Sequence, residues 1–590
     1  MSWPVEPPPI VRAPVSWRFA VLPGLFLLLW YLLTMPGAIA PRISDDRSMY
    51  LVTQALVDRH DVALQDPYEP QLQHGWQPPR PPSGTCPTEG AALGVGTRRG
   101  GPVFSKYGLG QSLAAIPLYV LGERLASLVS PPYRAEVPAF ATSAYNSLIT
   151  ALTAVLLCAL ALRLGWSRRV ALALVLLFGL ATPAWAYTTT FFSEPTIALC
   201  LLAALATMLW HEGPPSPTAA LLTGGWLGAA TLVRLDSALY IPLYALYALA
   251  AAAYGRTAAP RPYGAGHEAQ SRLLPDGWLR LLVLLAIGPA IALLVIGAYD
   301  LARFGNPITT GYNMSGGPGY NISSDYHDTH PPHTLQALWE GIYGQLLSPG
   351  KGLFLYAPIL LMLPWALAPF ARRYRRGALL LVLGIAAIAV LAHANTLIVW
   401  LGGWAWGPRF LISIIPVLLL PLGALLQGAG PWVRRVAWTL GLLGVLIQVP
   451  AVLLDKGVYI SHLEASVPGQ CIWRAEDLYK WHPRYSPLIG QWQRLLDAQT
   501  YQQAASVRAQ QLSLQRQSGQ SAVTVQRTIA EGWLTPAPQA WWELLSLQGI
   551  SWRDLALPLV LLAALASLFL WLAVRALGRT ELGQHMLHPL

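Results

Sequence analysis

Long apolar runs recur along the whole chain, and they constrain its fold more than any other feature of the sequence. A run of about 18 apolar residues is long enough to cross a bilayer as a helix. Hydrophobic residues make up 54% of the chain and charged residues 11%, whereas a soluble domain carries roughly 25% charged residues. The sequence therefore predicts an all-α polytopic membrane protein. The first run, Trp17 to Pro36, is too long for a signal peptide and lacks a small-residue cleavage site, so we expect it to remain as a span.

The apolar runs predict about 12 transmembrane helices, with both termini in the cytoplasm. One further apolar stretch, Leu113–Val129, is interrupted by Glu123 and Arg124. If it crossed the bilayer, the arginine clusters of all later loops would face outward, against the positive-inside rule. We therefore expect it to lie on the outer surface as a juxtamembrane helix. The predicted spans are 17–36, 138–162, 169–187, 194–210, 218–234, 237–254, 279–299, 353–370, 377–394, 410–428, 435–453 and 555–574.

This topology divides the chain into three parts. Residues 1–453 form a transmembrane core that includes an outer loop at 39–137 with juxtamembrane helices. Residues 454–554 form a partly helical extracytoplasmic segment, and residues 555–590 form the last transmembrane helix and a cytoplasmic tail. Cys86 and Cys471 both fall in the outer segments, where an oxidising compartment permits a disulfide, although their spacing does not decide between a bridge and free thiols. The net charge of +11 does not predict nucleic-acid binding, because the basic residues fall in short clusters between spans.

Two adjacent carboxylates, Asp45 and Asp46, follow the first span by a few residues. Acidic side chains at the edge of a bilayer are costly unless they have a function or partners, so one interpretation is a catalytic pair. The other is helix capping, with Ser44 or Asp45 as the N-cap and Asp46 favoured by the helix dipole in the first turn. The residues alone leave both interpretations open.

Other charged side chains also lie at predicted outer ends of spans. Each has a structural alternative: Glu194 begins a helix before Pro195, Arg234 forms a hairpin ion pair with Asp236, and Trp404 anchors the chain at the bilayer surface. The remaining members of the set are Lys351 and Arg409, each beside a glycine-containing turn. Taken together, they predict an outward-facing cavity with carboxylates on one wall and cations on another.

Such a cavity suits the transfer of a sugar from a phosphate leaving group. A hydroxyl acceptor loses its proton as it attacks, which requires a carboxylate within hydrogen-bond reach. The departing phosphate gathers negative charge and requires Arg, Lys or a metal ion. The sequence contains no P-loop, dinucleotide-binding fingerprint or zinc-ligand spacing that would indicate a cytosolic nucleotide or a structural metal.

The order and spacing of several short motifs resemble the GT-C glycosyltransferases of the protein O-mannosyltransferase and aminoarabinose-transferase type. That family carries an Asp-Glu pair after its first span, followed by a helix that contains Tyr. Ser44-Asp45-Asp46-Arg47-Ser48-Met49-Tyr50 is similar, with Asp46 in place of Glu. Further similar segments are Ser105–Gly110, Phe192–Pro195, Gly228–Arg234 and Gly403–Phe410, so the resemblance extends from the first span to about the tenth.

The resemblance implies a GT-C-like fold, a polyprenyl-phosphate sugar donor and inverting transfer on the extracytoplasmic side of the plasma or inner membrane. Asp45 would be the general base and Asp46 its catalytic partner, and Lys106 would bind the donor phosphate. Arg409 and Arg234 are the other cations expected at the phosphate. The expected cavity-lining residues are Tyr50, Tyr107, Glu194, Lys351 and Trp404.

One departure concerns a cofactor. Some relatives place Glu immediately before the lysine and use it for a divalent cation, whereas this chain has Ser105 there. A divalent cation held by Asp45 and Asp46 therefore remains an alternative to a site without a cofactor. The acceptor, which would be a glycan, a lipid or a protein, does not follow from the sequence.

Two other functions are alternatives to sugar transfer. The first is a transporter or flippase for lipid-linked glycans, but transporters usually show repeated halves and ionisable groups near the bilayer midplane. This chain has neither feature in its sequence. The second is a catalytically inactive scaffold for envelope assembly, which Asp46 and Ser105 leave open because they replace residues of the family pattern.

Overall fold

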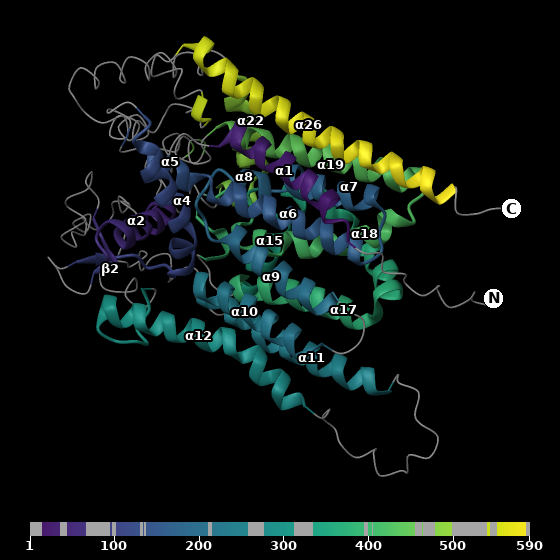
Figure 1. The fold of residues 1–590 in the computed structure, drawn as a ribbon, viewed down its shortest axis with the longest axis horizontal. Coiled ribbons are helices and arrows are strands. Elements are labelled where there is room, and N and C mark those ends of the chain that lie inside the picture. The colour runs from purple at the N-terminus through teal and green to yellow at the C-terminus, as the bar shows by residue number, and fades with distance from the viewer. Residues whose placement is uncertain are drawn as a thin grey trace.

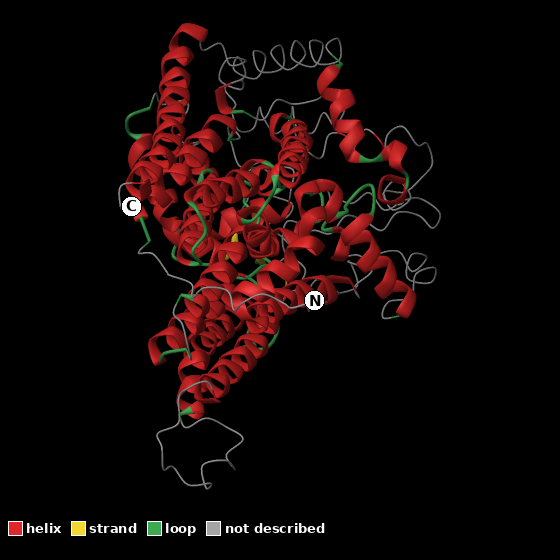
Figure 2. Ribbon diagram, turned by 90° about the vertical axis from the view of Figure 1, so that its right-hand side faces the viewer, coloured by secondary structure: helices red, strands yellow, loops and turns green. Residues whose placement is uncertain are grey.

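The computed structural model describes residues 15–35, 44–65, 95–96, 102–129, 134, 137–210, 215–257, 277–311, 334–394, 399–403, 405–454, 459, 463, 478–497, 540–542 and 551–585. Cys86, Cys471 and Trp404 lie outside these residues. Helices account for nearly all of the described secondary structure (Figure 2). The prediction of an all-α polytopic protein is confirmed.

The helices follow the apolar runs of the sequence. The α-helices are α1 (Trp17–Thr34), α2 (Ser44–Asp58), α4 (Gly110–Ala126), α5 (Val137–Ser143), α6 (Tyr145–Arg163), α7 (Arg168–Leu180), α8 (Ala184–Tyr187), α9 (Glu194–Leu209), α10 (Pro217–Val233), α11 (Tyr240–Thr257), α12 (Trp278–Phe304), α15 (Leu335–Leu347), α16 (Leu353–Tyr356), α17 (Leu363–Ala394), α18 (Ile415–Gln427), α19 (Pro431–Leu453), α22 (Pro487–Leu496) and α26 (Trp552–His585). The 3₁₀ helices are η2 (Leu235–Leu239), η4 (Pro358–Met362), η5 (Val399–Leu401), η6 (Arg409–Ile414) and η7 (Pro483–Tyr485).

Eight of the described helical segments are long and apolar enough to cross a membrane, and three shorter apolar helices lie at 194–209, 217–233 and 358–372. The chain is therefore a multi-pass membrane protein by the length and composition of its helices. The exact number of about 12 spans stays a prediction. One detail differs from the prediction. The second half of the expected span 353–370 and the whole of the expected span 377–394 belong to one helix, α17, which runs from Leu363 to Ala394.

The long helices form an elongated bundle whose central helices are buried and whose outer helices are exposed (Figure 1). Within the hydrophobic windows, 78% of the residues are buried at 409–427 but only 11% at 552–577 and 17% at 278–304. Accordingly, α26 and α12 lie along opposite flanks of the bundle in Figure 1. Their exposed apolar side chains are those that lipid would cover.

The first outer loop packs at one end of this bundle. There α2 and α4 lie against each other (Figure 1). The chain between them forms a small antiparallel sheet, which the sequence did not indicate. Its strands are β1 (Ala63–Leu64), β2 (Val95–Gly96) and β3 (Val103–Phe104), in the order β1-β3-β2. In the same view, α1 begins and α26 ends at the opposite end of the bundle. α4 is not among the candidate membrane spans, as the juxtamembrane interpretation of 113–129 requires.

Close helix contact depends on glycine where α10 meets α12. A Cβ atom on Gly224 would lie 2.2 Å from the Leu285 carbonyl oxygen, and one on Gly288 would lie 2.1 Å from the Gly224 oxygen. Larger side chains at these positions would force the two helices apart. Small residues have the same role in other pairs of membrane helices, where they let the backbones approach closely. This contact fixes the outer end of α10, which carries Arg234.

Trp541 and Trp542, which precede the last span, hydrogen-bond to the end of α1. Their indole Nε1 atoms each donate a 2.8 Å hydrogen bond, to the carbonyl oxygens of Leu32 and Leu33 respectively. The last carbonyls of a helix have no partner within it, so these two side chains satisfy the outer end of α1.

Candidate active site

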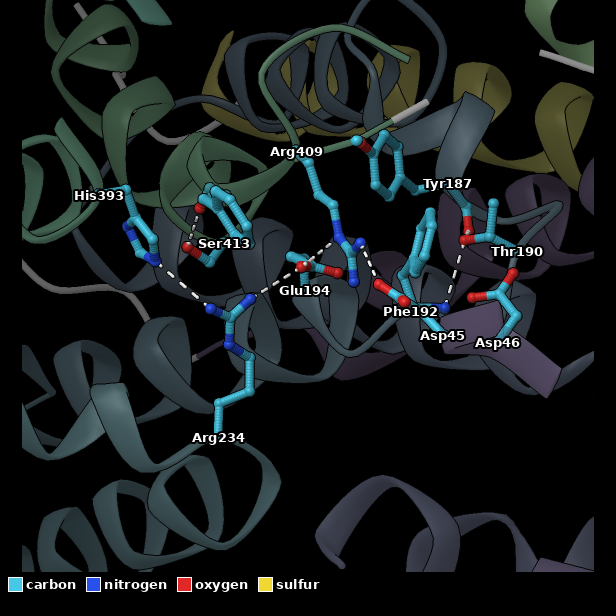
Figure 3. Close-up of polar contacts among 12 residues, drawn as sticks. Asp45, Asp46, Tyr187, Thr190, Phe192, Glu194, Arg234, His393, Arg409 and Ser413 are labelled. Carbon is cyan, nitrogen blue, oxygen red and sulfur yellow. Dashed lines mark hydrogen bonds and ion pairs between the residues drawn. The ribbon is translucent and has the colours of Figure 1, made fainter. Parts of the chain in front are cut away.

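The candidate site is a row of alternating charges at the end of the bundle that carries α2 and α4. Its centre is Arg409, the first residue of η6. The Arg409 Nη1 atom lies 2.6 Å from Asp45 Oδ2, and its Nε atom lies 2.8 Å from Glu194 Oε1 (Figure 3). Asp45 is in the first turn of α2 and Glu194 is the first residue of α9, so one guanidinium joins three separate elements.

The row continues through a second arginine. Arg234, which caps the end of α10, donates from Nη1 to Glu194 Oε1 at 2.9 Å (Figure 3). Its Nη2 atom donates to Asp236 Oδ2 at 2.6 Å. The predicted Arg234–Asp236 ion pair is therefore confirmed, and it extends to Glu194. His393 lies beyond it, with Nε2 3.1 Å from Asp236 Oδ2 and its ring stacked on Phe410.

His393 is a member of the row that sequence reasoning missed. It lies near the end of α17 within an apolar run, at 377–394. An ionisable side chain near the outer end of such a run is itself a signal of a functional site. This was the signal by which the sequence could have identified His393.

Lys106 and Tyr107 lie on the other side of Asp45. Burial raises the pKa of the Asp45 carboxyl, but the Arg409 guanidinium and then the Lys106 ammonium outweigh that effect, and a hydrogen bond with the Tyr107 side chain adds to theirs. The net result is a pKa of about 2, below the ordinary value of 3.8. Asp45 is therefore an anion at neutral pH, paired with Arg409 and stabilised also by the charge of Lys106.

The segment that carries Lys106 packs closely on the bundle. Ser105 accepts a 2.7 Å hydrogen bond from the Ser48 hydroxyl, which ties the segment to α2. A Cβ atom on Gly108 would lie 2.5 Å from the Val233 oxygen, and one on Gly110 would lie 2.6 Å from the Val233 nitrogen. The two glycines thus allow the segment to lie directly on the last turn of α10, next to Arg234.

Asp46 has a different environment from Asp45. Its side chain is buried, and its Oδ2 atom accepts a 3.0 Å hydrogen bond from the Phe191 backbone N–H. Asp45 and Asp46 also both lie in the first turn of α2, where the helix dipole favours acids, so this part of the alternative interpretation holds alongside the ion pair. Because α2 begins at Ser44, neither Ser44 nor Asp45 precedes the helix as its N-cap. The two carboxylates engage different partners, and in the described part of the chain no three His, Cys, Asp or Glu side chains come together as metal ligands would.

Lys351 lies apart from this row. It is fully buried, and its Nζ atom donates to the carbonyl oxygens of Gly403 at 2.7 Å and Ala405 at 2.6 Å. The chain there leads directly to Arg409, and Gly402, Gly403 and Gly407 have positive φ angles. The structure thus places Lys351 behind the turn as a support for it, and not on the small cavity described next.

A cavity of about 20 Å³ opens beside Arg234, which is room for about one water molecule. Glu194 lines it. Its polar neighbours there are Arg234, Asp236, Ser237, Tyr240, His393 and Ser413. Tyr50 lies elsewhere on α2, with its ring 6.1 Å from that of Tyr119 on α4.

No protein-family model matches the chain, and no curated protein does. Among solved structures, it is similar to ArnT from Cupriavidus metallidurans in the apo state, with 15% identity and a TM-score of 0.39 over 81% of this chain and 73% of that one. It is also similar to the apo form of the Archaeoglobus fulgidus oligosaccharyltransferase, with 11% identity and a TM-score of 0.36 over 78% of this chain and 59% of that one. Because both TM-scores lie below 0.5, these likenesses do not by themselves assign the chain an activity.

Proposed function

We propose that this protein is an inverting membrane glycosyltransferase that moves a sugar from a polyprenyl-phosphate donor to an acceptor on the extracytoplasmic side. One observation carries the proposal: the Asp45 carboxylate is ion-paired with Arg409, at the end of a bundle of membrane-spanning helices, and the charge of Lys106 also lowers its pKa. A carboxylate beside two cations supplies both parts of the chemistry, a base for the acceptor and a site for the phosphate.

The charges of the row suggest how the donor engages. Arg409 and Arg234 already contact carboxylates, so a donor phosphate competes with Asp45 and Glu194 for them. When the phosphate takes the contacts of Arg409 and Lys106, Asp45 loses the two cations that lower its pKa. The pKa of Asp45 then rises when the acceptor requires a base. This rise favours catalysis because an ideal catalytic pKa lies near the working pH.

The proposed reaction is a single displacement. The acceptor oxygen forms a bond to the anomeric carbon of the sugar while the bond from that carbon to the phosphate oxygen breaks. The acceptor proton passes to Asp45, and the phosphate leaves with the bonding electron pair, stabilised by Arg409 and Lys106. Asp46, bound to the Phe191 N–H, supports the start of α2 and does not face the same hydroxyl.

We also propose that the site faces outward from the cell or inner membrane and that both termini are cytoplasmic. The donor would then approach sideways from the bilayer. The first residues of α1 and the last residues of α26 lie at the end of the bundle away from α2 and α4 (Figure 1). This arrangement supports placing both termini on one side of the membrane.

The proposal is tested by incubating the purified protein with a panel of polyprenyl-phosphate sugars and measuring released polyprenyl phosphate. Release with at least one donor, dependent on an added glycan, lipid or peptide fraction, is the expected result. Reconstituted vesicles that move lipid-linked glycan across the bilayer without releasing polyprenyl phosphate would identify a flippase instead.

A further inference from the structure

A buried ion pair at the end of α12 lies outside the charge row. Asp300 and Arg303 are 1% and 5% exposed, and they form a salt bridge between residues one helical turn apart. Removing two charges from water costs several kcal/mol each, so such a pair persists only where further hydrogen bonds compensate for the loss. The position of those further bonds indicates what the pair does.

Arg303 uses its remaining donors on the segment that carries Lys106. Its Nη1 atom donates to the carbonyl oxygen of Ser105 and lies 3.5 Å from that of Tyr107. These two residues flank Lys106, so one planar guanidinium contacts the backbone on both sides of it. Only arginine offers several donors in one rigid plane, whereas a lysine ammonium is a single point.

Aromatic rings fix the position of that guanidinium. The Arg303 Cζ atom lies 3.7 Å from the centre of the Tyr299 ring and 4.6 Å from that of Phe304. Together with Asp300, these contacts hold the guanidinium in one orientation on α12. The backbone of 105–107 is therefore tied to a rigid helix.

A glycine closes the other side of the segment. A Cβ atom on Gly311 would lie 2.4 Å from Lys106 Cα, so the chain after α12 passes directly against the Lys106 backbone. Ser48 holds Ser105 from α2, as described above. With the backbone restrained on these sides, the point from which the Lys106 side chain extends is fixed, and from there its charge lowers the pKa of Asp45.

We infer that Arg303 is a positioning residue for Lys106: it fixes the backbone of 105–107 from α12 so that the ammonium faces Asp45 and the donor phosphate. This inference rests on the proposed function for the role of Lys106. It goes beyond it by assigning part of donor binding to a side chain that does not touch the donor.

The test removes the pair as a whole, because a single substitution would leave a buried charge unpaired and could unfold the protein. The variant is Asp300→Leu with Arg303→Met, and the matched control is Arg280→Met at the exposed start of α12. We expect the donor KM of the pair variant to rise about 10-fold, as for the loss of hydrogen bonds to a charged group, with kcat changed less. The control should match the wild type.

A double-mutant cycle separates positioning from general damage. In a Lys106→Ala background, the pair variant should cause no further rise in donor KM. An equal rise with and without Lys106 would overturn the inference, because a merely structural role acts in both backgrounds.

A second readout does not require transferase activity. With Cys86 and Cys471 replaced by serine, the thiol of Lys106→Cys should react with a charged thiol reagent at a clearly different rate when Asp300→Leu and Arg303→Met are added. An unchanged rate in the folded variant would overturn the inference. If no form of the protein releases polyprenyl phosphate, the proposed function fails, and the thiol rate still decides whether Arg303 positions residue 106.

Discussion

The Arg409 Nη1 atom lies 2.6 Å from Asp45 Oδ2, and this ion pair joins two residues 364 positions apart in the sequence. The same guanidinium contacts Glu194, which contacts Arg234. The outer ends of α2, α9, α10 and η6 are thus linked through alternating charges. The predicted effects of substitutions depend on the ion pairs within this row and on the donor phosphate that would compete for its arginines.

Lys106 and Arg409 are predicted to bind the donor phosphate, with Arg234 as a third cation. Lys106→Ala should weaken donor affinity by about 10-fold or more, since charge-assisted hydrogen bonds contribute roughly 1.5–3 kcal/mol. Arg409→Ala should have at least as large an effect, because it also leaves Asp45 and Glu194 without their shared partner. Binding of a non-hydrolysable polyprenyl phosphonate to each purified variant measures the effect. Unchanged affinity in both variants would move the phosphate site elsewhere.

The pH dependence of the free enzyme should reflect the low pKa of Asp45. Because that pKa is about 2, below the ordinary 3.8, the base stays ionised as the pH falls through the weakly acidic range. The profile of kcat/KM, which reports the free enzyme, should therefore show no acid limb from Asp45 above about pH 4. In Lys106→Ala one cause of the low pKa is absent, so protonation should begin at higher pH. An acid limb in the wild type that is unmoved in Lys106→Ala would contradict this assignment.

Lys351 and Lys106 should respond differently to the same substitution. Lys351→Met removes both donors to the Gly403 and Ala405 carbonyl oxygens, so it should lower the melting temperature. Each lost hydrogen bond to a charged group contributes roughly 1.5–3 kcal/mol. Lys106→Met should lower donor use and leave the melting temperature near that of the wild type. Thermal unfolding in detergent measures both, and a lower melting temperature in Lys106→Met alone would reverse the two roles.

The predicted topology places every arginine cluster in the cytoplasm. Single cysteines introduced at 300–352 or 480–497 should react in intact cells with a reagent that does not cross membranes. Cysteines at 372–376 should react only after the cells are opened. Labelling of 372–376 in intact cells would contradict the predicted topology, and with it the cytoplasmic placement of both termini.

The sequence predicted which residues would gather, but among their pairings it predicted only Arg234 with Asp236. Apolar runs and arginine clusters placed Asp45, Glu194, Arg234 and Arg409 at the outer ends of spans, and the structure brings all four into one row. The choice of partners depends on how helices far apart in the sequence are packed, which no local pattern encodes.

Other features had no local signal or a misleading one. Lys351 looked like a cavity residue because a glycine-rich turn surrounds it, yet its partners are backbone carbonyls, which any residue provides. His393 was hidden within an apolar run. Trp541 and Trp542 donate to carbonyl oxygens at the end of α1, a pairing across the fold that no local pattern indicates. The short strands have only two residues each, too few to show an alternating pattern.

The central claim, that Asp45 is the general base of a sugar transferase, is tested most directly by the turnover of Asp45→Asn with a donor that the wild type uses. Asparagine is nearly isosteric, so folding and donor binding should persist, and Asp46→Asn serves as the matched control. A positioned base contributes about 10²–10⁴-fold, so the release of polyprenyl phosphate should fall by that factor in Asp45→Asn and by less in Asp46→Asn. A folded Asp45→Asn protein that releases polyprenyl phosphate at the wild-type rate would contradict the assignment of this row as the active site.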